Sequence, residues 1–123
     1  MTIKRPHESA LACIAVDYPE LNVTNTTEDI LHEYYFLKTP LLDFKILIIA
    51  AEGYAQSTYN LQIKVYLDDV LKITLTWIET TLTTKSDSCD VSGWADGKHK
   101  ITIKKVVSGG TGRIQAFENW VKK

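Results

Sequence analysis

Two runs of strictly alternating apolar and polar residues, separated by two aspartates, constrain this chain more than any other feature. Residues 61–67 and 71–77 carry an apolar side chain at every second position, and Asp68-Asp69 lies between them. A period of two is typical of a half-buried strand. Aspartate tolerates the positive φ that two-residue hairpin turns require, so the sequence predicts an antiparallel hairpin. Its expected inward residues are Leu61, Ile63, Val65, Leu67, Leu71, Ile73, Leu75 and Trp77.

Other segments of strand length complete a β-rich pattern. Residues 9–16, 29–37, 42–51, 98–107 and 113–121 are predicted strands, and 42–51 is apolar on both faces, as in a centrally placed strand. In residues 29–37 one face is expected to carry Ile30, His32, Tyr34 and Phe36, and the other Leu31, Glu33, Tyr35 and Leu37. In residues 98–107 the inward side chains are expected to be His99, Ile101 and Ile103, and the outward ones Lys98, Lys100, Thr102 and Lys104.

The polar stretch from residue 80 to residue 94 gives a weaker pattern. Residues 81–84 are expected to form a short edge strand and residues 86–93 a loop. Residues 17–27, which hold Pro19 and a run of Asn and Thr, are also expected to be a loop, and residues 108–112 a Gly-rich hairpin loop.

Composition agrees with an all-β chain. Isoleucine (12), valine (8) and threonine (14) are abundant among the 123 residues, and β-branched side chains favour strands. The sequence therefore predicts one domain over residues 1–123, an antiparallel jelly-roll-like β-sandwich of about eight strands, with residues 1–8 as an optional extended arm.

Charge and hydropathy exclude some classes of partner. The net charge is −1, whereas a protein that binds nucleic acid through phosphate contacts is normally basic, so no nucleic-acid partner is expected. No apolar run is longer than seven residues, as at 10–16, so we expect no membrane span and no signal peptide. For Cys13 and Cys89, two unpaired thiols are favoured and one disulfide is the alternative.

The chain carries no recognisable catalytic motif. It has no Gly-x-Ser-x-Gly, no His-Glu-x-x-His, no P-loop and no dinucleotide fingerprint, so we expect neither an enzyme nor a cofactor. Asp87, Asp90 and Asp96 are weak calcium candidates because calcium prefers several oxygen ligands from loops. Turn formation explains these aspartates equally well.

Aromatic residues are the candidate binding residues. Trp94 lies in a predicted loop, and Tyr54 and Tyr59 flank the predicted loop at residues 53–58. An exposed aromatic ring offers an apolar face to a sugar or to a protein partner. The alternative for Trp94 is that it packs over the open end of the sandwich.

A family resemblance adds to these patterns. The hairpin turn Val65-Tyr-Leu-Asp-Asp69 is followed by Trp94-Ala-Asp-Gly-Lys-His-Lys-Ile-Thr-Ile-Lys104 and by a last strand after a Gly-rich loop. This order resembles the galactose-binding-like jelly-roll modules over residues 60–121. Such modules occur in carbohydrate-binding modules, bacterial surface proteins and phage virion proteins. The resemblance implies a sandwich fold and a structural role for His99 on the core side.

The resulting hypothesis is a non-enzymatic structural or adhesive module. A phage virion component, a capsid decoration or tail protein, is the main expectation, with other virion or surface proteins as partners. The resemblance favours a homo-oligomer, a trimer above all, made in the cytoplasm and located on the virion or an extracellular surface. The alternative is a carbohydrate-binding module that contacts glycan through Trp94, Tyr54 and Tyr59.

Overall fold

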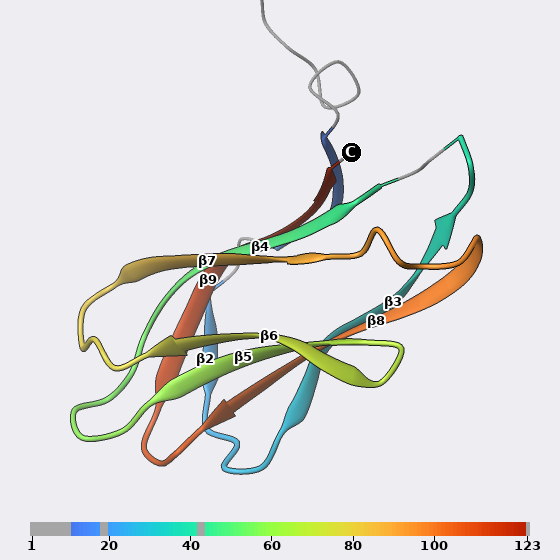
Figure 1. Ribbon diagram of the computed structural model, residues 1–123. Helices are drawn as coiled ribbons and strands as arrows, with labels where there is room; N and C mark the ends of the chain where they lie inside the picture. Colours follow the sequence, from blue (N-terminus) through green and yellow to red (C-terminus); the bar gives the residue numbers. More distant parts are fainter. Residues whose placement is uncertain (1–10, 18–19, 42–43, 123) are drawn as a thin grey trace, which may run out of the picture.

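The computed structural model is a sandwich of two antiparallel sheets (Figure 1). It describes residues 11–17, 20–41 and 44–122. The strands of this part are β1 Leu11–Asp17, β2 Leu21–Val23, β3 Asp29–Lys38, β4 Ile46–Tyr54, β5 Leu61–Leu67, β6 Val70–Trp77, β7 Thr83–Asp90, β8 Gly97–Val107 and β9 Gly112–Lys122. One sheet has the order β1-β9-β4-β7 with β2 also on β9, and the other has the order β3-β8-β5-β6.

The prediction of an all-β sandwich of about eight strands is confirmed. β1 pairs with residues 117–122 of β9, and β2 pairs with residues 112–114 of the same strand. The two short strands therefore share one edge, so each sheet has four strand positions. Within the described residues, no helix is long and apolar enough to cross a membrane.

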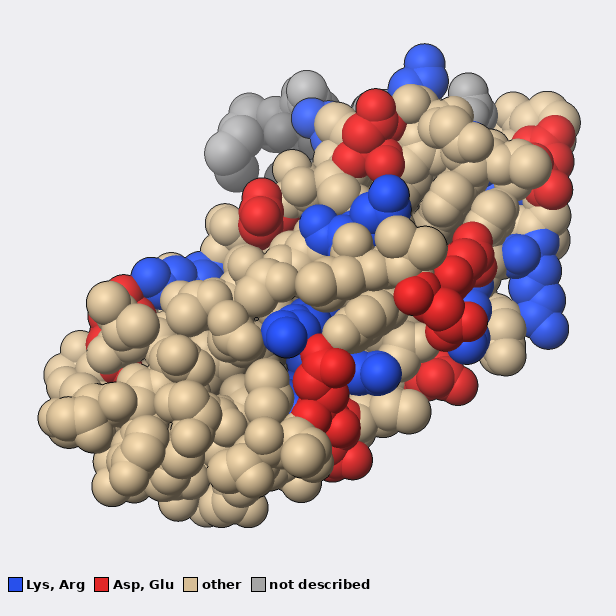
Figure 2. All heavy atoms as spheres, turned by 60° about the horizontal axis from the view of Figure 1, so that its bottom comes forward, with Lys and Arg blue, Asp and Glu red and all other residues tan. Residues whose placement is uncertain are grey.

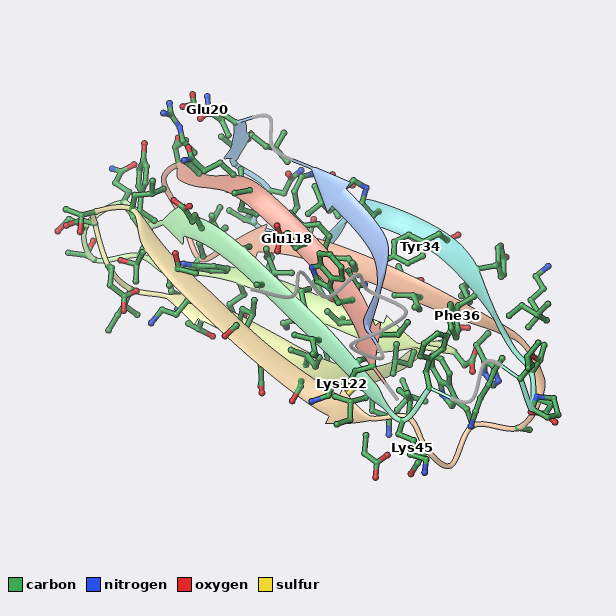
Figure 3. All side chains as sticks on the ribbon, turned by 90° about the horizontal axis from the view of Figure 1, so that it is seen from above. Glu20, Tyr34, Phe36, Lys45, Glu118 and Lys122 are labelled. Atoms are coloured by element: carbon green, nitrogen blue, oxygen red, sulfur yellow. The ribbon has the colours of Figure 1, made fainter. Side chains whose placement is uncertain are left out.

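The core lies between the inward rows of the two sheets. Inward side chains alternate with outward ones along β4, β5 and β8, as the period-two pattern predicts. The largest fully buried side chains include Trp77, Phe117, Leu47, Ile49, Leu61, Ile63, Ile73, Ile101 and Ile103. Tyr34 of β3 reaches across the sandwich, where its hydroxyl accepts a hydrogen bond from buried Asn119 of β9 (Figure 3).

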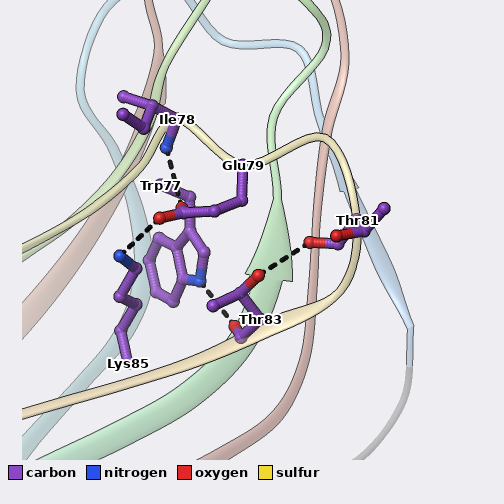
Figure 4. Close-up of polar contacts among 6 residues, drawn as sticks. All are labelled: Trp77, Ile78, Glu79, Thr81, Thr83 and Lys85. Atoms are coloured by element: carbon purple, nitrogen blue, oxygen red, sulfur yellow. Dashed lines mark hydrogen bonds and ion pairs between the residues drawn. The ribbon is translucent and has the colours of Figure 1, made fainter.

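Polar contacts fix the connection between the sheets at Trp77 (Figure 4). The buried indole donates from Nε1 to the carbonyl of Thr83 at 2.8 Å, so the ring is satisfied inside the core. Glu79 accepts from the backbone N–H of Ile78 at 3.0 Å and pairs with Lys85 at 2.7 Å. These contacts hold the chain where it leaves β6 and enters β7.

The Asp68-Asp69 turn joins β5 and β6 as predicted. Both aspartates have positive φ, 49° and 67°, which is the geometry of a type I′ hairpin turn. The expectation that Leu71 faces inward is wrong, because the register shifts between Val65 and Tyr66 and leaves Leu71 46% exposed. The extra residue turns this side chain away from the core.

The expected loop at residues 86–93 is wrong. β7 continues to Asp90, because its whole length pairs with residues 46–53 of β4. The strand is polar on its exposed side, with Thr84, Ser86, Ser88 and Asp90, so its composition resembles that of a loop. Pairing with a buried neighbour overrides the low strand propensity of Ser and Asp.

Two further boundaries differ from expectation. β2 lies inside the predicted loop at residues 17–27. Ile30 does not share a face with His32, Tyr34 and Phe36 as expected. It is 51% exposed, because the register with β8 shifts between Ile30 and His32 and brings Leu31 against the core. The predicted strand at 42–51 begins at Ile46, and residues 42–43, like the proposed arm at 1–8, lie outside the described residues.

The two cysteines are too far apart for the disulfide alternative. Cys13 lies on β1 and Cys89 on β7, at opposite edges of the same sheet, with β9 and β4 between them. Three strand spacings correspond to about 14 Å, whereas a disulfide needs Cα atoms within about 7 Å. Cys89 is accordingly a free, half-buried thiol, and burial raises its pKa.

The turn yields a matched pair of predictions. Asp69→Gly removes the cost of a positive φ in a residue with a side chain, at the expense of an exposed ion pair to Lys100, so we expect the free energy of unfolding to rise by about 0.5–1 kcal/mol. Asp68→Gly gains the same backbone freedom but loses hydrogen bonds to His99 and to the Lys100 N–H, so it should lower that energy by about 1 kcal/mol. Urea denaturation of both variants is the measurement, and equal shifts would contradict the prediction.

Candidate functional site

Trp94 packs over one end of the sandwich. Its indole stacks on the ring of His99, with centroids 4.3 Å apart and planes 2° apart, and lies 6.2 Å from the ring of Phe36. Buried Lys38 donates from Nζ to the Trp94 carbonyl at 2.7 Å and to the Ser92 carbonyl at 3.3 Å. These contacts hold Trp94 against the core, which is the alternative to an exposed binding role.

His99 lies beneath Trp94 with both ring nitrogens facing acceptor oxygens. Its Nε2 lies 2.7 Å from the carbonyl of Ala95, and its Nδ1 lies 2.7 Å from Asp68 Oδ2. Burial lowers the pKa of His99, but the hydrogen bonds to Ala95 and Asp68 outweigh it, and the pKa is raised. Because both nitrogens face acceptors, the imidazolium satisfies both contacts. These contacts are structural ones, as the resemblance implies.

Tyr54 and Tyr59 lie at the opposite end of the molecule. The ring of Tyr59 covers Gly109 and Gly110, and the ring of Tyr54 lies 5.8 Å from the guanidinium of Arg113. β8 has 11 residues and runs from the Trp94 end to this one, so about 33 Å separates the two ends. The structure therefore does not bring the three predicted binding residues together.

The three calcium candidates are also dispersed. Asp87 and Asp90 lie on β7, and Asp96 follows in the loop before β8. Asp87 accepts from the Ser88 N–H at 2.8 Å, and Asp90 accepts from the Ser92 N–H at 2.7 Å. The described part of the chain contains no group of three acidic, His or Cys side chains placed to hold a metal ion. Local backbone contacts account for Asp87 and Asp90, and calcium stays a prediction of the sequence.

The most distinctive surface is one that the sequence did not single out, on the outer side of the four-stranded sheet. Tyr35 of β3 is 59% exposed, and half-buried Tyr66 lies on β5, so the two tyrosines flank the central strand β8. Tyr35 pairs with Lys100 and Tyr66 with Thr102, which places their Cα atoms about 12 Å apart. Two lysines of β8 contact the rings: Lys98 lies 4.0 Å from the Tyr35 centroid and Lys104 4.7 Å from the Tyr66 centroid. We call Tyr35, Tyr66, Lys98 and Lys104 the tyrosine face; Thr102, which lies between the two tyrosines on β8, is buried beneath it.

A polar pocket continues the tyrosine face toward the end that carries Tyr59. Its volume is about 370 Å³. It is lined by Thr26, Glu28, Asn60, Gln62, Lys64, Val106, Val107 and Ser108. Lys64 lies opposite Lys104 in the register of β5 and β8, so the pocket adjoins the tyrosine face. Figure 2, which brings the lower side of Figure 1 forward, shows lysines and acids interspersed along the middle and an uncharged region toward one end.

Tyr66 is fixed by a small network at the border of the pocket. Its hydroxyl donates to Glu28 at 2.5 Å, and Lys64 pairs with the same carboxylate at 3.3 Å. The hydrogen bond from Tyr66 lowers the pKa of Glu28 and raises the pKa of Tyr66. Glu28 is therefore ionised near neutral pH, and the phenol ring is held in one orientation.

The strand patterns contain part of the signal for this surface. Alternation correctly predicts that Tyr66, Lys98 and Lys104 face outward and that Tyr35 faces away from Tyr34. Alternation does not predict that β3 and β5 are the two neighbours of β8. The tyrosine face depends on that sheet order.

The charge on His99 predicts a pH dependence of stability. With a raised pKa in the folded chain, its contribution is fully present below the unfolded pKa of about 6.5 and is lost as the pH rises through the folded pKa. The free energy of unfolding should therefore fall as the pH rises above about 6.5, and less steeply in Asp68→Asn, which lacks the carboxylate charge. Urea titrations at a series of pH values test this, and identical profiles for both proteins would assign the dependence to another group.

Comparison with known proteins identifies the fold. No family model matches the sequence, and no curated protein matches it. Among solved structures, 12 chains match. One of them, described as "CBM4 structure and function", superimposes with a TM-score of 0.55 over 93% of this chain and 79% of its own, at 12% sequence identity. The chain is thus a β-sandwich that structurally matches a family 4 carbohydrate-binding module.

Proposed function

We propose that this chain is a carbohydrate-binding module that contacts its glycan with the tyrosine face and the polar pocket. The observation that carries the proposal is the continuous surface they form on one sheet: two tyrosines across β8, beside a pocket of about 370 Å³ lined mainly by hydroxyl, amide and charged groups. The fold likeness to a carbohydrate-binding module supports it.

The chemistry of this surface suits a sugar chain. A pyranose has an apolar C–H face, which packs on an aromatic ring, and equatorial hydroxyls, which need hydrogen-bond partners at its edge. Tyr35 and Tyr66 supply the rings. The pocket supplies donors and acceptors of several kinds, among them Asn60, Gln62 and Ser108. Binding sites commonly combine apolar contact area with a few placed polar groups in this way.

The rigid sheet favours binding further. Tyr66 lies on β5, which is paired on both sides, and Tyr35 lies on β3, which is paired on one side. The hydroxyl of Tyr66 is also hydrogen-bonded to Glu28. A ring that is already ordered loses little side-chain entropy when a ligand arrives. This proposal assigns no bond-breaking step to the chain, and the expectation that it is not an enzyme stays a prediction.

Alanine variants test the assignment of the surface. We first identify a polysaccharide that the wild type binds. Tyr35→Ala and Tyr66→Ala should each lower the affinity for it by about tenfold, because each variant removes one stacking ring. Tyr54→Ala is the matched control, a tyrosine on β4 in the other sheet, and should change the affinity less than about twofold. Affinity electrophoresis in gels cast with soluble polysaccharides, followed by calorimetry on the retained ones, is the measurement.

Two other results of the same experiment would contradict the proposal. Selective loss of affinity in Tyr54→Ala, Tyr59→Ala or Trp94→Ala, with melting temperatures checked for each, would move the site to the residues singled out by sequence. If the wild type binds none of a panel that includes neutral and acidic polysaccharides, carbohydrate binding itself is contradicted.

The virion hypothesis is kept as a second proposal, and the solution mass separates it from the first. A phage capsid decoration or tail protein, located on the virion or another extracellular surface, rests on the sequence arguments. We expect light scattering of the purified chain to give a monomer if it is a glycan-binding module, and a trimer if it is a virion component. A trimer would send the work to co-sedimentation with capsids or tails.

A further inference from the structure

We infer that the tyrosine face selects acidic polysaccharides, chains whose sugars carry carboxylate or sulfate groups. The inference rests on the proposed function and names its ligand class. It starts from the way each ring is paired. Lys98 lies over Tyr35 at 4.0 Å and Lys104 over Tyr66 at 4.7 Å, so both rings of the face carry an ammonium group.

Ion pairs distinguish the neighbouring lysines of this surface from Lys98 and Lys104. Lys100 pairs with Asp69 at 2.7 Å, and Lys64 pairs with Glu28 at 3.3 Å. The direct contacts of Lys98 and Lys104 are instead the two tyrosine rings, although Lys104 is close enough to Glu28 to help lower its pKa. The attraction between a cation and an exposed ring is weak. These two ammonium groups therefore remain available to a stronger, anionic partner.

The register of the sheet concentrates this charge. Lys64 and Lys104 are directly opposite each other in the pairing of β5 with β8. Like charges at opposed positions destabilise a sheet. Glu28 offsets one of the pair through its contact with Lys64. The chain as a whole has a net charge of −1, so this row of lysines is a local feature rather than a consequence of a basic composition.

Each lysine–tyrosine pair can act as one receptor for an acidic sugar. The anionic group takes the ammonium from the ring, and the vacated ring accepts the apolar C–H face of the sugar. A neutral sugar has to displace the ammonium without offering it a charged partner. Lys98 and Lys104 are six residues apart on β8, about 20 Å, so the two pairs are spanned by a polymer rather than by a monosaccharide.

The test compares charged and neutral glycans on the full chain. Polygalacturonate is the acidic probe and hydroxyethylcellulose the neutral one, each in affinity gels and calorimetry at low and at high salt. The wild type should bind polygalacturonate at least about tenfold more tightly than hydroxyethylcellulose, and the preference should shrink at high salt because exposed charges are screened.

Lysine variants locate the effect. K98Q/K104Q should lose about tenfold in affinity for polygalacturonate and should fold normally, because both side chains lie on the outer side of the sheet. The control K45Q/K122Q removes the same charge from the five-stranded sheet, where these two residues lie at one end (Figure 3), and should bind as the wild type does. An equal loss in the control would overturn the inference, since net charge alone would then explain the binding.

Further outcomes separate the inference from the function it rests on. Binding to hydroxyethylcellulose that equals or exceeds binding to polygalacturonate overturns the acidic preference and leaves carbohydrate binding standing. Binding to neither, nor to any other glycan, overturns both. Equal retention of a single-stranded DNA of similar charge density would show a general polyanion surface and would also overturn selection for a glycan.

Discussion

The register of β8 is the constraint on which both the core and the tyrosine face depend. Its inward residues, Ile101 and Ile103, are fully buried, while the intervening side chains form the outer row. A slip of one residue would exchange the two sets. The register is held at one end by Asp68, which binds the Lys100 N–H and the His99 ring, and at the other by Asn25, whose carbonyl accepts from the Val107 N–H. A loop contact, a hairpin turn and the hydrophobic pattern thus agree on one alignment.

Charged side chains close the sandwich where its apolar rows end. Lys38 is buried at the end that carries Trp94 and binds the carbonyls of Ser92 and Trp94. Lys105 faces inward near the other end and pairs with Asp29 at 2.5 Å. An ammonium group with these partners is fully hydrogen-bonded inside the fold. If another protein molecule packed against it, the ammonium group would have to give up its water without such partners. Lys38 lies on the edge strand β3, where an inward-pointing charge also discourages edge-to-edge association of strands.

Sequence reasoning succeeded where alternation is strict and failed where pairing decides. The hairpin around Asp68-Asp69 and the strand predicted at residues 98–107 follow from period two alone. The second half of β7 was predicted as a loop, because an edge strand with one polar side has the composition of a loop and only its pairing with β4 shows that it is a strand. Leu71 was predicted inward, and Ile30 was predicted to share a face with His32, and both predictions are wrong because a bulge reverses alternation without leaving a mark in composition.

The candidate site was harder to predict because it is a property of sheet order. Tyr35 and Tyr66 are separated by β4 and several turns in the chain, yet they lie on the two strands that flank β8. Trp94, by contrast, stands out in the sequence but is engaged by His99 and Phe36.

A fold can host many functions, so the likeness to a carbohydrate-binding module at 12% identity fixes the architecture and leaves the ligand to the surface. On this chain two requirements of the binding surface conflict. Rings that stack on sugars must be exposed, yet exposed rings on a sheet attract neighbouring cations. The lysines over Tyr35 and Tyr66 meet both demands if the ligand itself is an anion, because its charge draws the ammonium aside as the sugar approaches the ring.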